Sequence, residues 1–455
     1  MLFENKNEVS GTSVALLGFG RANRAVADFL LPLGARLFVY DEREVSDNVR
    51  FAYEARGAQF RVGSLPESLS EEVLVRSPGL RPDLPVIRRA LAGGATLTGE
   101  CELFLSLTPA TTVGVTGSDG KTTTANLAAG LLAAAGRRVL LGGNNGVPLL
   151  PRVGDLRQGD FAVVELSSFQ LMTLKRPTDI AIITNITPNH LNWHTDMAEY
   201  IAAKQHIYGE KTRLVLNADN PVTRGLAATR EDNTVLFSTD RESVRGHPDR
   251  SACYIAGNAV VLEENGDARR YDCLDAFRLP GRHNLENLLA ATAATAEYLT
   301  PTAPRRTLAD FSGVAHRLQY VGCAGEVHYY NSSIDTTPTR TAAALSALGG
   351  SPLVLLGGRG KGVSFAPLAQ ALQHAKGAFL FGEAAGELEE ALQGVLPLQR
   401  FTRLREAFAA AAAAAMPGDT VLLSPACTAF DEFRDFEERG EVFCAMVARL
   451  AAERK

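Results

Sequence analysis

The sequence has no paired cysteine motif, no long apolar run and no excess of positive charge. Its six cysteines are scattered, which fits a reducing cytosol and argues against a zinc site or a disulfide framework. The longest near-continuous apolar run, 407–416, is mostly alanine and far too short to cross a bilayer, so no membrane insertion is expected. The formal net charge is −5, which leaves no broad basic field to attract nucleic acid.

The beginning of the sequence also lacks a targeting pattern. Residues 1–7 contain no basic region followed by a long apolar segment, so we expect no signal peptide and a cytoplasmic location. The chain has 455 residues, of which 46% are hydrophobic and 21% charged. This length and composition predict a soluble protein of two to four domains, each able to bury its own core. We expect it to be a monomer.

The most informative stretch is 114–124, which reads Gly-Val-Thr-Gly-Ser-Asp-Gly-Lys-Thr-Thr-Thr. It lies between a β-prone run at 111–115 and a helix-prone run at 126–135. A glycine-rich turn in this position directs backbone N–H groups at phosphates, and the helix N-terminus adds partial positive charge. Lys121 can reach the outer phosphates of a nucleotide, and the Thr122 hydroxyl can hold Mg²⁺.

The loop departs from the strict P-loop spacing, which requires glycine where this chain has Val115. Gly117 stands three positions before Gly120 instead. An ordinary βα turn is the alternative to a shorter phosphate loop. The residues predicted to bind ATP here are Gly117, Ser118, Asp119, Gly120, Lys121, Thr122 and Thr123.

Alternating strands and helices divide the chain into three α/β blocks. We predict a Rossmann-like N-terminal domain, a central P-loop-type ATPase domain with a parallel sheet, and a Rossmann-like C-terminal domain, with boundaries at 1–107, 108–313 and 314–455. The predicted strands after the first block are 111–115, 139–141, 161–164, 180–184, 352–356, 378–381 and 420–423. The predicted helices of the third block are 367–374, 384–392 and 404–416.

The first block opens as a βαβ unit, with a strand at 13–17, a helix at 22–33 and a strand at 36–40 that ends at Asp41. Its dinucleotide fingerprint is incomplete, because Asn23 stands at the third glycine position. Three interpretations remain open: an NAD site, a crevice for another nucleotide such as a UDP moiety, and a βα turn that packs closely on the sheet.

Candidate catalytic residues follow the strands of the second block. Glu165 comes directly after 161–164, where a carboxylate at the carboxyl end of a central strand is well placed to hold Mg²⁺. A helix cap or a salt bridge is the alternative. Ser167, Ser168 and Gln170 either bind a ligand or cap the next helix.

His190 lies in a polar turn that follows the predicted strand at 180–184, and both a ligand role and a structural role are open for it. Trp193, the only tryptophan, is expected to pack. Lys204 falls in a helical run at 197–208, where a lysine is normally found on a solvated face.

Two further glycine-rich loops carry polar side chains. Asn144 and Asn145 stand in Gly-Gly-Asn-Asn-Gly, which is either a hairpin-like turn or a ligand loop. Lys361 lies in the loop 357–362 after an apolar strand, where a cation suits an anionic ligand or developing phosphate charge. A surface turn is the alternative for Lys361.

Together these stretches resemble the Mur ligases, the ATP-dependent amino-acid ligases of peptidoglycan synthesis, over essentially the whole chain. The matching stretches are 116–124, Glu165, His190, Lys204, Gly281–Asn287 (the GxHNxxN element) and His316-Arg317. Stretches near both ends look like those of family members that add D-glutamate to UDP-N-acetylmuramoyl-L-alanine. These are Ser77-Pro78-Gly79, 99–104, 424–427 and 430–440.

The resemblance implies a role for each of these positions. Glu165 would help hold one Mg²⁺, while His190 and a carbamylated Lys204 would hold a second. Asn287 would contact adenine, and Arg317 would lie near the phosphates or ribose of ATP. The implied catalytic residues are Lys121, Glu165, His190, Lys204 and Lys361, and the implied metal ligands are Thr122, Glu165, His190 and Lys204. The UDP substrate would meet Asp41, Arg43, Ser77, Gly79, Asn144 and Ser167, and D-glutamate would meet Thr336, Lys361, Phe430 and Phe436.

The chain departs from the family pattern at several positions. Asn189 and Asn192 stand where aspartates are common, and Ala429 stands where a serine often contacts the D-glutamate side chain. Ser332 replaces an aspartate that binds ribose, a role that Asp335 is a candidate to take over.

The expected reaction is amide-bond formation through an acyl phosphate. Three rival interpretations are another ligase of this superfamily (a Mur ligase for a different amino acid or a folylpolyglutamate-type synthetase), a nicotinamide dehydrogenase that uses the first βαβ unit, and a non-catalytic ATP-binding regulator.

Overall fold

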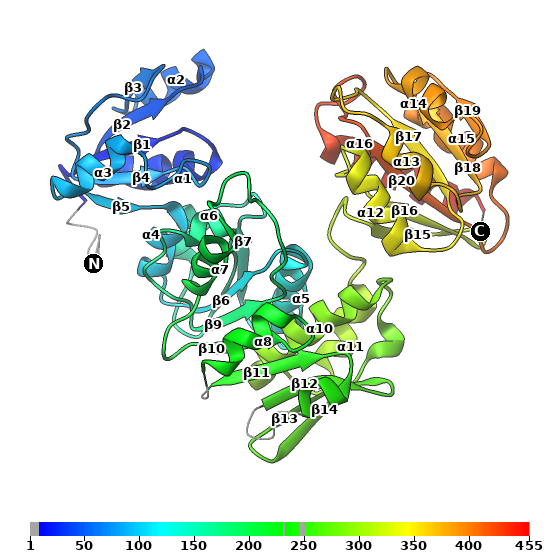
Figure 1. Cartoon of the computed structure of the whole chain (residues 1–455), viewed down its shortest axis with the longest axis horizontal. Coiled ribbons are helices and arrows are strands. Elements are labelled where there is room, and N and C mark those ends of the chain that lie inside the picture. The colour runs from blue at the N-terminus through cyan, green and yellow to red at the C-terminus, as the bar shows by residue number, and fades with distance from the viewer. Residues whose placement is uncertain (1–8, 231–232, 246–250, 455) are drawn as a thin grey trace. The chain divides into compact units, whose positions relative to one another are not determined.

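The computed structural model describes residues 9–230, 233–245 and 251–454, so the segment 1–7 lies outside the described residues. The chain forms two compact units. One comprises Met1–Asp275 with Leu285–Thr307, and the other comprises Ala276–Asn284 with Leu308–Lys455. Within the described residues, the first unit contains sheets of five and nine strands and the second contains a sheet of six (Figure 1). No helix in the described ranges is long and apolar enough to span a membrane.

The first sheet is parallel throughout and has the order β3-β2-β1-β4-β5. Its strands are β1 (Ser13–Leu17), β2 (Arg36–Asp41), β3 (Gln59–Val62), β4 (Val73–Arg76) and β5 (Thr96–Thr98), and its helices are α1 (Arg21–Leu30), α2 (Asp47–Glu54) and α3 (Pro85–Ala92). The predicted βαβ unit is therefore confirmed. Asn23 is fully buried, and its Nδ2 donates to the carbonyl oxygens of Leu17 and Gly18 at 3.1 and 2.7 Å. The turn at Gly18 therefore packs closely on the sheet.

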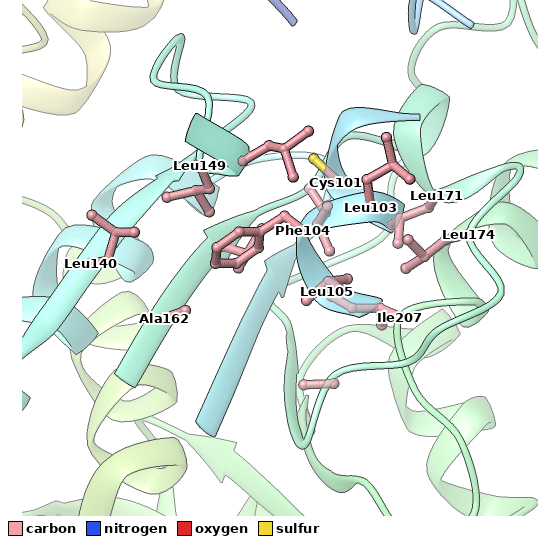
Figure 2. Close-up of a cluster of buried hydrophobic side chains, with 14 of the residues drawn as sticks. Cys101, Leu103, Phe104, Leu105, Leu140, Leu149, Ala162, Leu171, Leu174 and Ile207 are labelled. Carbon is pink, nitrogen blue, oxygen red and sulfur yellow. The ribbon is translucent and has the colours of Figure 1, made fainter. Parts of the chain in front are cut away.

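Helix α4 (Glu100–Leu107) leads from the first sheet into the second. Its side chains Leu103, Phe104 and Leu105 are almost fully buried, in one cluster with Leu140 and Ala162 of the second sheet (Figure 2). Burying each large apolar side chain contributes about 1.5–3 kcal/mol. One hydrophobic core therefore runs through the whole first unit and holds its two sheets together.

The second sheet has the order β14-β13-β12-β11-β10-β9-β6-β8-β7. Its strands are β6 (Thr111–Thr116), β7 (Val139–Gly143), β8 (Phe161–Glu165), β9 (Ile180–Ile183), β10 (Arg213–Asn217), β11 (Thr234–Ser238), β12 (Ser251–Ala256), β13 (Ala259–Glu264) and β14 (Asp267–Asp272). The accompanying helices are α5 (Lys121–Ala134), α6 (Ser168–Leu171), α7 (Met197–Gln205), α8 (Pro221–Ala228), α9 (Arg241–Arg245), α10 (Arg282–Thr295) and α11 (Ala303–Asp310).

The prediction of a parallel sheet holds for β12 through β7 but is wrong at the other edge. There β12, β13 and β14 form an antiparallel meander. Asn265 and Gly266, which connect the last two strands, have φ angles of 53° and 85°, and such a pair is typical of a two-residue hairpin turn. The Asn-Gly dipeptide was the sequence signal for this edge.

The sheet of the second unit has the order β15-β16-β20-β17-β18-β19, parallel except for the first pair. Its strands are β15 (Gln319–Ala324), β16 (Val327–Asn331), β17 (Leu353–Gly357), β18 (Gly377–Phe381), β19 (Leu398–Arg400) and β20 (Thr420–Ala426). Its helices are α12 (Pro338–Leu348), α13 (Ala366–Ala371), α14 (Ala385–Leu392), α15 (Leu404–Ala414) and α16 (Phe436–Glu453). Because β16, β20 and β17 are neighbours, the loops that leave their carboxyl ends meet at one edge of the sheet.

Candidate active site

The phosphate loop joins β6 to α5, and two glycines make its tight path possible. Gly117 has φ 154°, and a Cβ there would overlap Thr184 Oγ1. Gly120 has φ 80°, and a Cβ there would overlap Asn287 Oδ1. Because Gly120 caps the helix in a left-handed conformation, α5 begins at Lys121, five residues before the predicted start. The first helical N–H groups therefore lie at the loop, as a phosphate site requires.

Lys121 folds back over this loop. Its Nζ donates to the carbonyl oxygens of Gly117 and Ser118, both at 2.9 Å. The Ser118 side chain is buried and supports the loop from beneath, because its Oγ lies 2.9 Å from both Thr187 O and Tyr200 Oη. Asn287, also buried, accepts a hydrogen bond from Thr124 Oγ1 at 3.1 Å.

Lys204 does not lie on a solvated face, as its place in the sequence predicted. It is 1% exposed, and its Nζ donates to Gly117 O at 2.8 Å and to Thr116 Oγ1 at 3.2 Å. The same Nζ lies 4.6 Å from the centre of the Tyr200 ring. Burial, assisted by the positive charge of Lys121, lowers the pKa of Lys204 well below its ordinary value. Helix α7 thus places an amine beneath the phosphate loop.

Glu165 ends β8, directly beside Val115 of β6, and is 2% exposed. Its Oε1 accepts a hydrogen bond from Asn144 Nδ2 at 2.9 Å. Its Oε2 is buried and has no hydrogen-bond partner among the described residues. The loop at Asn144 makes a tight turn, because the N–H of Gly143 donates to Val147 O at 2.7 Å and the N–H of Gly146 donates to Gly143 O at 3.2 Å. The same turn carries the Asn144 side chain to Glu165.

His190 has a left-handed backbone, with φ 56°, a conformation that costs energy in a residue other than glycine. The turn that follows holds it, because the N–H groups of Trp193 and His194 both donate to its carbonyl oxygen at 3.0 Å. Partial burial lowers the pKa of His190, and the positive charges of Lys121 and Lys204 lower it further. Because β8, β6 and β9 are neighbouring parallel strands, the segments that carry Glu165, Lys121 and His190 all leave the same edge of the sheet.

A polar network that no sequence pattern indicated lies beside this turn. His194 is 2% exposed, with Nδ1 3.2 Å from Glu199 Oε2 and Nε2 2.9 Å from Ser168 Oγ. Glu199 pairs with Arg81 from the loop after β4. Single charged residues far apart in the sequence carry no local pattern that would have pointed to this network.

The residues predicted to bind the UDP substrate lie mainly around the turn Gly18–Gly20. Asp41 Oδ2 accepts from the N–H of Phe19 at 2.6 Å, and its Oδ1 accepts from the N–H of Arg43 at 2.9 Å. A Cβ at Gly18 would come within 2.6 Å of Ser77 Oγ. Ser167 caps α6 in a reciprocal arrangement with Gln170.

In the second unit, two residues predicted to bind D-glutamate meet. Lys361 Nζ donates to Thr336 Oγ1 at 2.9 Å, although one follows β17 and the other follows β16. Phe430 is 60% exposed, and Phe436 is the first residue of α16 and half-buried. Arg317 is exposed in the same unit.

Asp335 does not support the ribose role that its place in the sequence suggested. It is 6% exposed, and its Oδ2 accepts a hydrogen bond from Ser424 Oγ at 2.9 Å. Ser332 is also buried, and its Oγ accepts from the N–H of Leu318 at 3.0 Å. Both side chains therefore hold this unit together from within.

Comparisons with known proteins show the family to which this chain belongs. A model described as the Mur ligase middle domain matches residues 115–295, and one described as the Mur ligase glutamate ligase domain matches residues 316–427. A protein of Ruminiclostridium cellulolyticum named UDP-N-acetylmuramoylalanine–D-glutamate ligase is 37% identical over 462 residues, covering 98% of each chain. One of the same name from Symbiobacterium thermophilum is 39% identical over 450 residues, covering 96% of this chain and 98% of the other. The chain belongs to the Mur ligase family.

Solved structures share the fold of this Mur ligase. The UDP-N-acetylmuramate–alanine ligase of Thermotoga maritima has a TM-score of 0.54 at 18% identity, covering 96% of this chain and 99% of the other. A UDP-N-acetylmuramoyl-L-alanyl-D-glutamate–2,6-diaminopimelate ligase has a TM-score of 0.57 at 20% identity, covering 83% and 92% respectively. The predicted three-domain α/β fold is thereby confirmed.

The polar groups of this Mur ligase fit a divalent cation. Over the described parts of the chain no three His, Cys, Asp or Glu side chains gather into a metal cluster. Mg²⁺ does not require such a cluster, because it usually binds one or two carboxylates together with substrate phosphates. The buried, unpartnered Oε2 of Glu165 beside the phosphate loop is a carboxylate oxygen of this kind.

Proposed function

We propose that this Mur ligase is the ATP-dependent enzyme that joins D-glutamate to UDP-N-acetylmuramoyl-L-alanine in the cytoplasm, for peptidoglycan synthesis. The observation that carries the proposal is identity of more than a third to relatives of that name, along almost the entire chain. We propose a monomer that binds no nucleic acid. The UDP-substrate residues of this proposal are Asp41, Arg43, Ser77, Gly79, Asn144 and Ser167, and the ATP residues outside the phosphate loop are Asn287 and Arg317.

In the first step, an oxygen of the substrate's alanine carboxylate attacks the γ-phosphorus of ATP, and ADP leaves. The product is an acyl phosphate. Both reactants are anions, so the site must offset their repulsion. Lys121 is placed to do so because its Nζ already lies over the phosphate loop, and the N–H groups at the start of α5 add partial positive charge. Mg²⁺, held by Thr122, Glu165 and His190, would supply further positive charge.

The buried amine of Lys204 supports carbamylation at this position. Lys204 donates to one hydroxyl and one carbonyl oxygen, and burial keeps its amine closer to the neutral form. A neutral amine adds CO₂ with formation of an N–C bond and release of one proton. The resulting carbamate is an anion with two oxygens, so it would replace a cation that repels Mg²⁺ by a ligand for it.

In the second step, the neutral amine of D-glutamate attacks the acyl carbon, phosphate leaves, and the nitrogen loses a proton. Lys361 and Thr336 are suited to bind a carboxylate of the amino acid, since a cation and a hydroxyl lie 2.9 Å apart there. Phe430 and Phe436 complete the proposed D-glutamate residues. Ala429 offers no hydroxyl, so a second carboxylate must find other donors.

The decisive experiment combines phosphate release with mass detection of the UDP-linked product. The protein, ATP, Mg²⁺ and UDP-N-acetylmuramoyl-L-alanine are incubated with D-glutamate, L-alanine, L-lysine or meso-diaminopimelate in parallel, and folate with L-glutamate provides a separate arm. We expect a D-glutamate adduct and phosphate release that depends on D-glutamate. A product with another amino donor, or phosphate release without any, would overturn the assignment.

A further inference from the structure

Two loops of the first unit are tied together by Arg81. The loop 77–83 follows β4, and the loop 184–196 follows β9 and leads into α7. The Arg81 guanidinium donates to both carboxylate oxygens of Glu199, at 2.9 and 3.1 Å, and to the carbonyl oxygen of Trp193 at 2.6 Å. Asp83 holds the other edge of the guanidinium at 2.8 and 3.0 Å. Five oxygens from three residues thus fix one side chain.

Trp193 makes the reciprocal connection. Its indole Nε1 donates to the carbonyl oxygen of Gly79 at 2.9 Å, and the Arg81 guanidinium lies 5.1 Å from its ring centre. Two hydrogen bonds and a cation–π contact therefore bind Trp193 to the loop that carries the proposed UDP-substrate residues.

The same residues fix the turn of His190. Its carbonyl oxygen accepts from the N–H groups of Trp193 and His194, and Glu199 accepts from the N–H of Thr195 at 2.9 Å and lies 3.2 Å from His194 Nδ1. A left-handed residue such as His190 persists only where its surroundings hold it. In this chain the residues that hold His190 are in turn bound by Arg81, which contacts Trp193 and Glu199.

We propose that Arg81 is a positioning residue that holds the His190 turn in place through Trp193 and Glu199, and thereby couples substrate binding at the 77–79 loop to His190. This inference rests on the proposed function, in which that loop binds the muramoyl nucleotide and His190 is a metal ligand. In this proposal Arg81 acts through Trp193 and Glu199, the residues that it contacts.

Arginine suits this position better than lysine, because its side chain must donate to a carboxylate and a carbonyl oxygen together. The Arg81 and Glu199 side chains are only 22% and 21% exposed, and a planar guanidinium can serve a carboxylate and a carbonyl at the same time. Lysine has the charge but not the planar fork, so Arg81→Lys should be an intermediate variant. Arg81→Met keeps the length of the side chain and removes all of its donors.

Arg88 offers a matched control. It belongs to α3, its side chain is 69% exposed, and among the described residues it forms an ion pair only with Asp83, at 3.7 Å. Arg88→Met therefore removes the same charge close to the loop without touching Trp193 or Glu199. Glu199→Gln tests the contact from the other side.

Trp193 is the only tryptophan among the 455 residues, so intrinsic fluorescence reports on this contact directly. UDP-N-acetylmuramoyl-L-alanine is titrated into the native protein and each variant, and Trp193 emission is recorded. In the native protein and Arg88→Met we expect a saturable change in emission. In Arg81→Met we expect red-shifted emission and loss of that change, with a smaller effect in Arg81→Lys.

Steady-state assays supply the second measurement. Removing support from a metal ligand typically costs 10- to 100-fold, so we expect the half-saturating Mg²⁺ concentration to rise about tenfold in Arg81→Met and Glu199→Gln, with KM for D-glutamate unchanged. Equal emission changes and equal Mg²⁺ dependence in native protein and Arg81→Met would overturn the inference, even if Tm fell. The fluorescence arm needs no turnover, so it decides the inference even where the D-glutamate assay fails.

Discussion

Lys121 and Lys204 donate to the same backbone oxygen, the carbonyl of Gly117, at 2.9 and 2.8 Å. One amine comes from the start of α5 and the other from within α7. Burial lowers the pKa of Lys204, and the positive charge of Lys121 lowers it further. Helices α5 and α7 therefore both place an amine at the phosphate loop, and the buried one is kept closer to its neutral form.

Lys204→Met should change how stability depends on pH. The folded pKa of Lys204 is lowered from an ordinary value of about 10.4, so the unfolded chain binds more protons in the window between the two values. Native stability should therefore rise with pH across this window and be lost as pH falls toward the lowered pKa. In Lys204→Met this rise disappears.

The measurement is urea unfolding of both proteins at several pH values up to 10, in buffer freed of CO₂. Parallel pH profiles for the native protein and the variant would contradict the prediction. Ligase activity of the variant should fall by about 100-fold or more, because a metal ligand of the proposed site is lost.

Gly120→Ala should lower the free energy of unfolding by more than the cost of its left-handed backbone angle alone. A left-handed alanine costs about 1–2 kcal/mol, and the overlap of its Cβ with the buried Asn287 should add about 1–3 kcal/mol. Gly136→Ala is the matched control, because Gly136 has φ 81° but open space around its Cβ. Thermal unfolding and ATP binding are measured for both variants, and Gly120→Ala should lose more stability and more ATP affinity than Gly136→Ala. Equal losses in the two variants would show that the overlap with Asn287 adds nothing to the cost of the backbone angle.

The sequence predicted what local pattern controls. The apolar strands 13–17 and 161–164, the glycine-rich loop between β6 and α5, and the strand ends that carry Glu165 and His190 all follow from short-range rules. The Lys361–Thr336 contact follows as well, since neighbouring parallel strands bring their carboxyl ends together.

What the sequence did not reveal depends on tertiary contact. Lys204 is buried against Thr116 and Gly117, which lie 88 and 87 residues earlier in the chain. No local pattern in a nine-residue helix with one lysine indicates this burial. Arg81 and Glu199 are separated by 118 residues, so no periodicity connects them. The burial of Asp335 was not evident either, because its partner Ser424 lies 89 residues away.

Glu165→Gln should reduce the increase in Tm that Mg²⁺ and ATP produce, without lowering the stability of the ligand-free protein. The native carboxylate has a buried oxygen without a partner among the residues that the structure describes, which is unfavourable until a cation binds. The variant should therefore be at least as stable as the native protein without ligand, and its Tm should rise much less on addition of Mg²⁺ and ATP. Activity should fall by about 100-fold. A native-like Tm increase with Mg²⁺ and ATP would show that Glu165 is not a metal ligand.

Lys361→Met should weaken D-glutamate binding while leaving the nucleotide sites intact. Lys361 is exposed at its loop and donates to Thr336 Oγ1, so its removal should cost little stability. A hydrogen bond to a charged group contributes about 1.5–3 kcal/mol, which predicts an increase in KM for D-glutamate of about 10- to 100-fold.

Arg359→Gln is the control for this prediction. Arg359 lies two residues earlier in the same loop, but its side chain forms an exposed ion pair with Glu383, which contributes little. Its KM for D-glutamate should stay within about twofold of the native value. Equal increases of this KM in both variants would contradict the prediction. They would show that the general positive charge of the loop, and not the Lys361 ammonium in particular, supports D-glutamate binding.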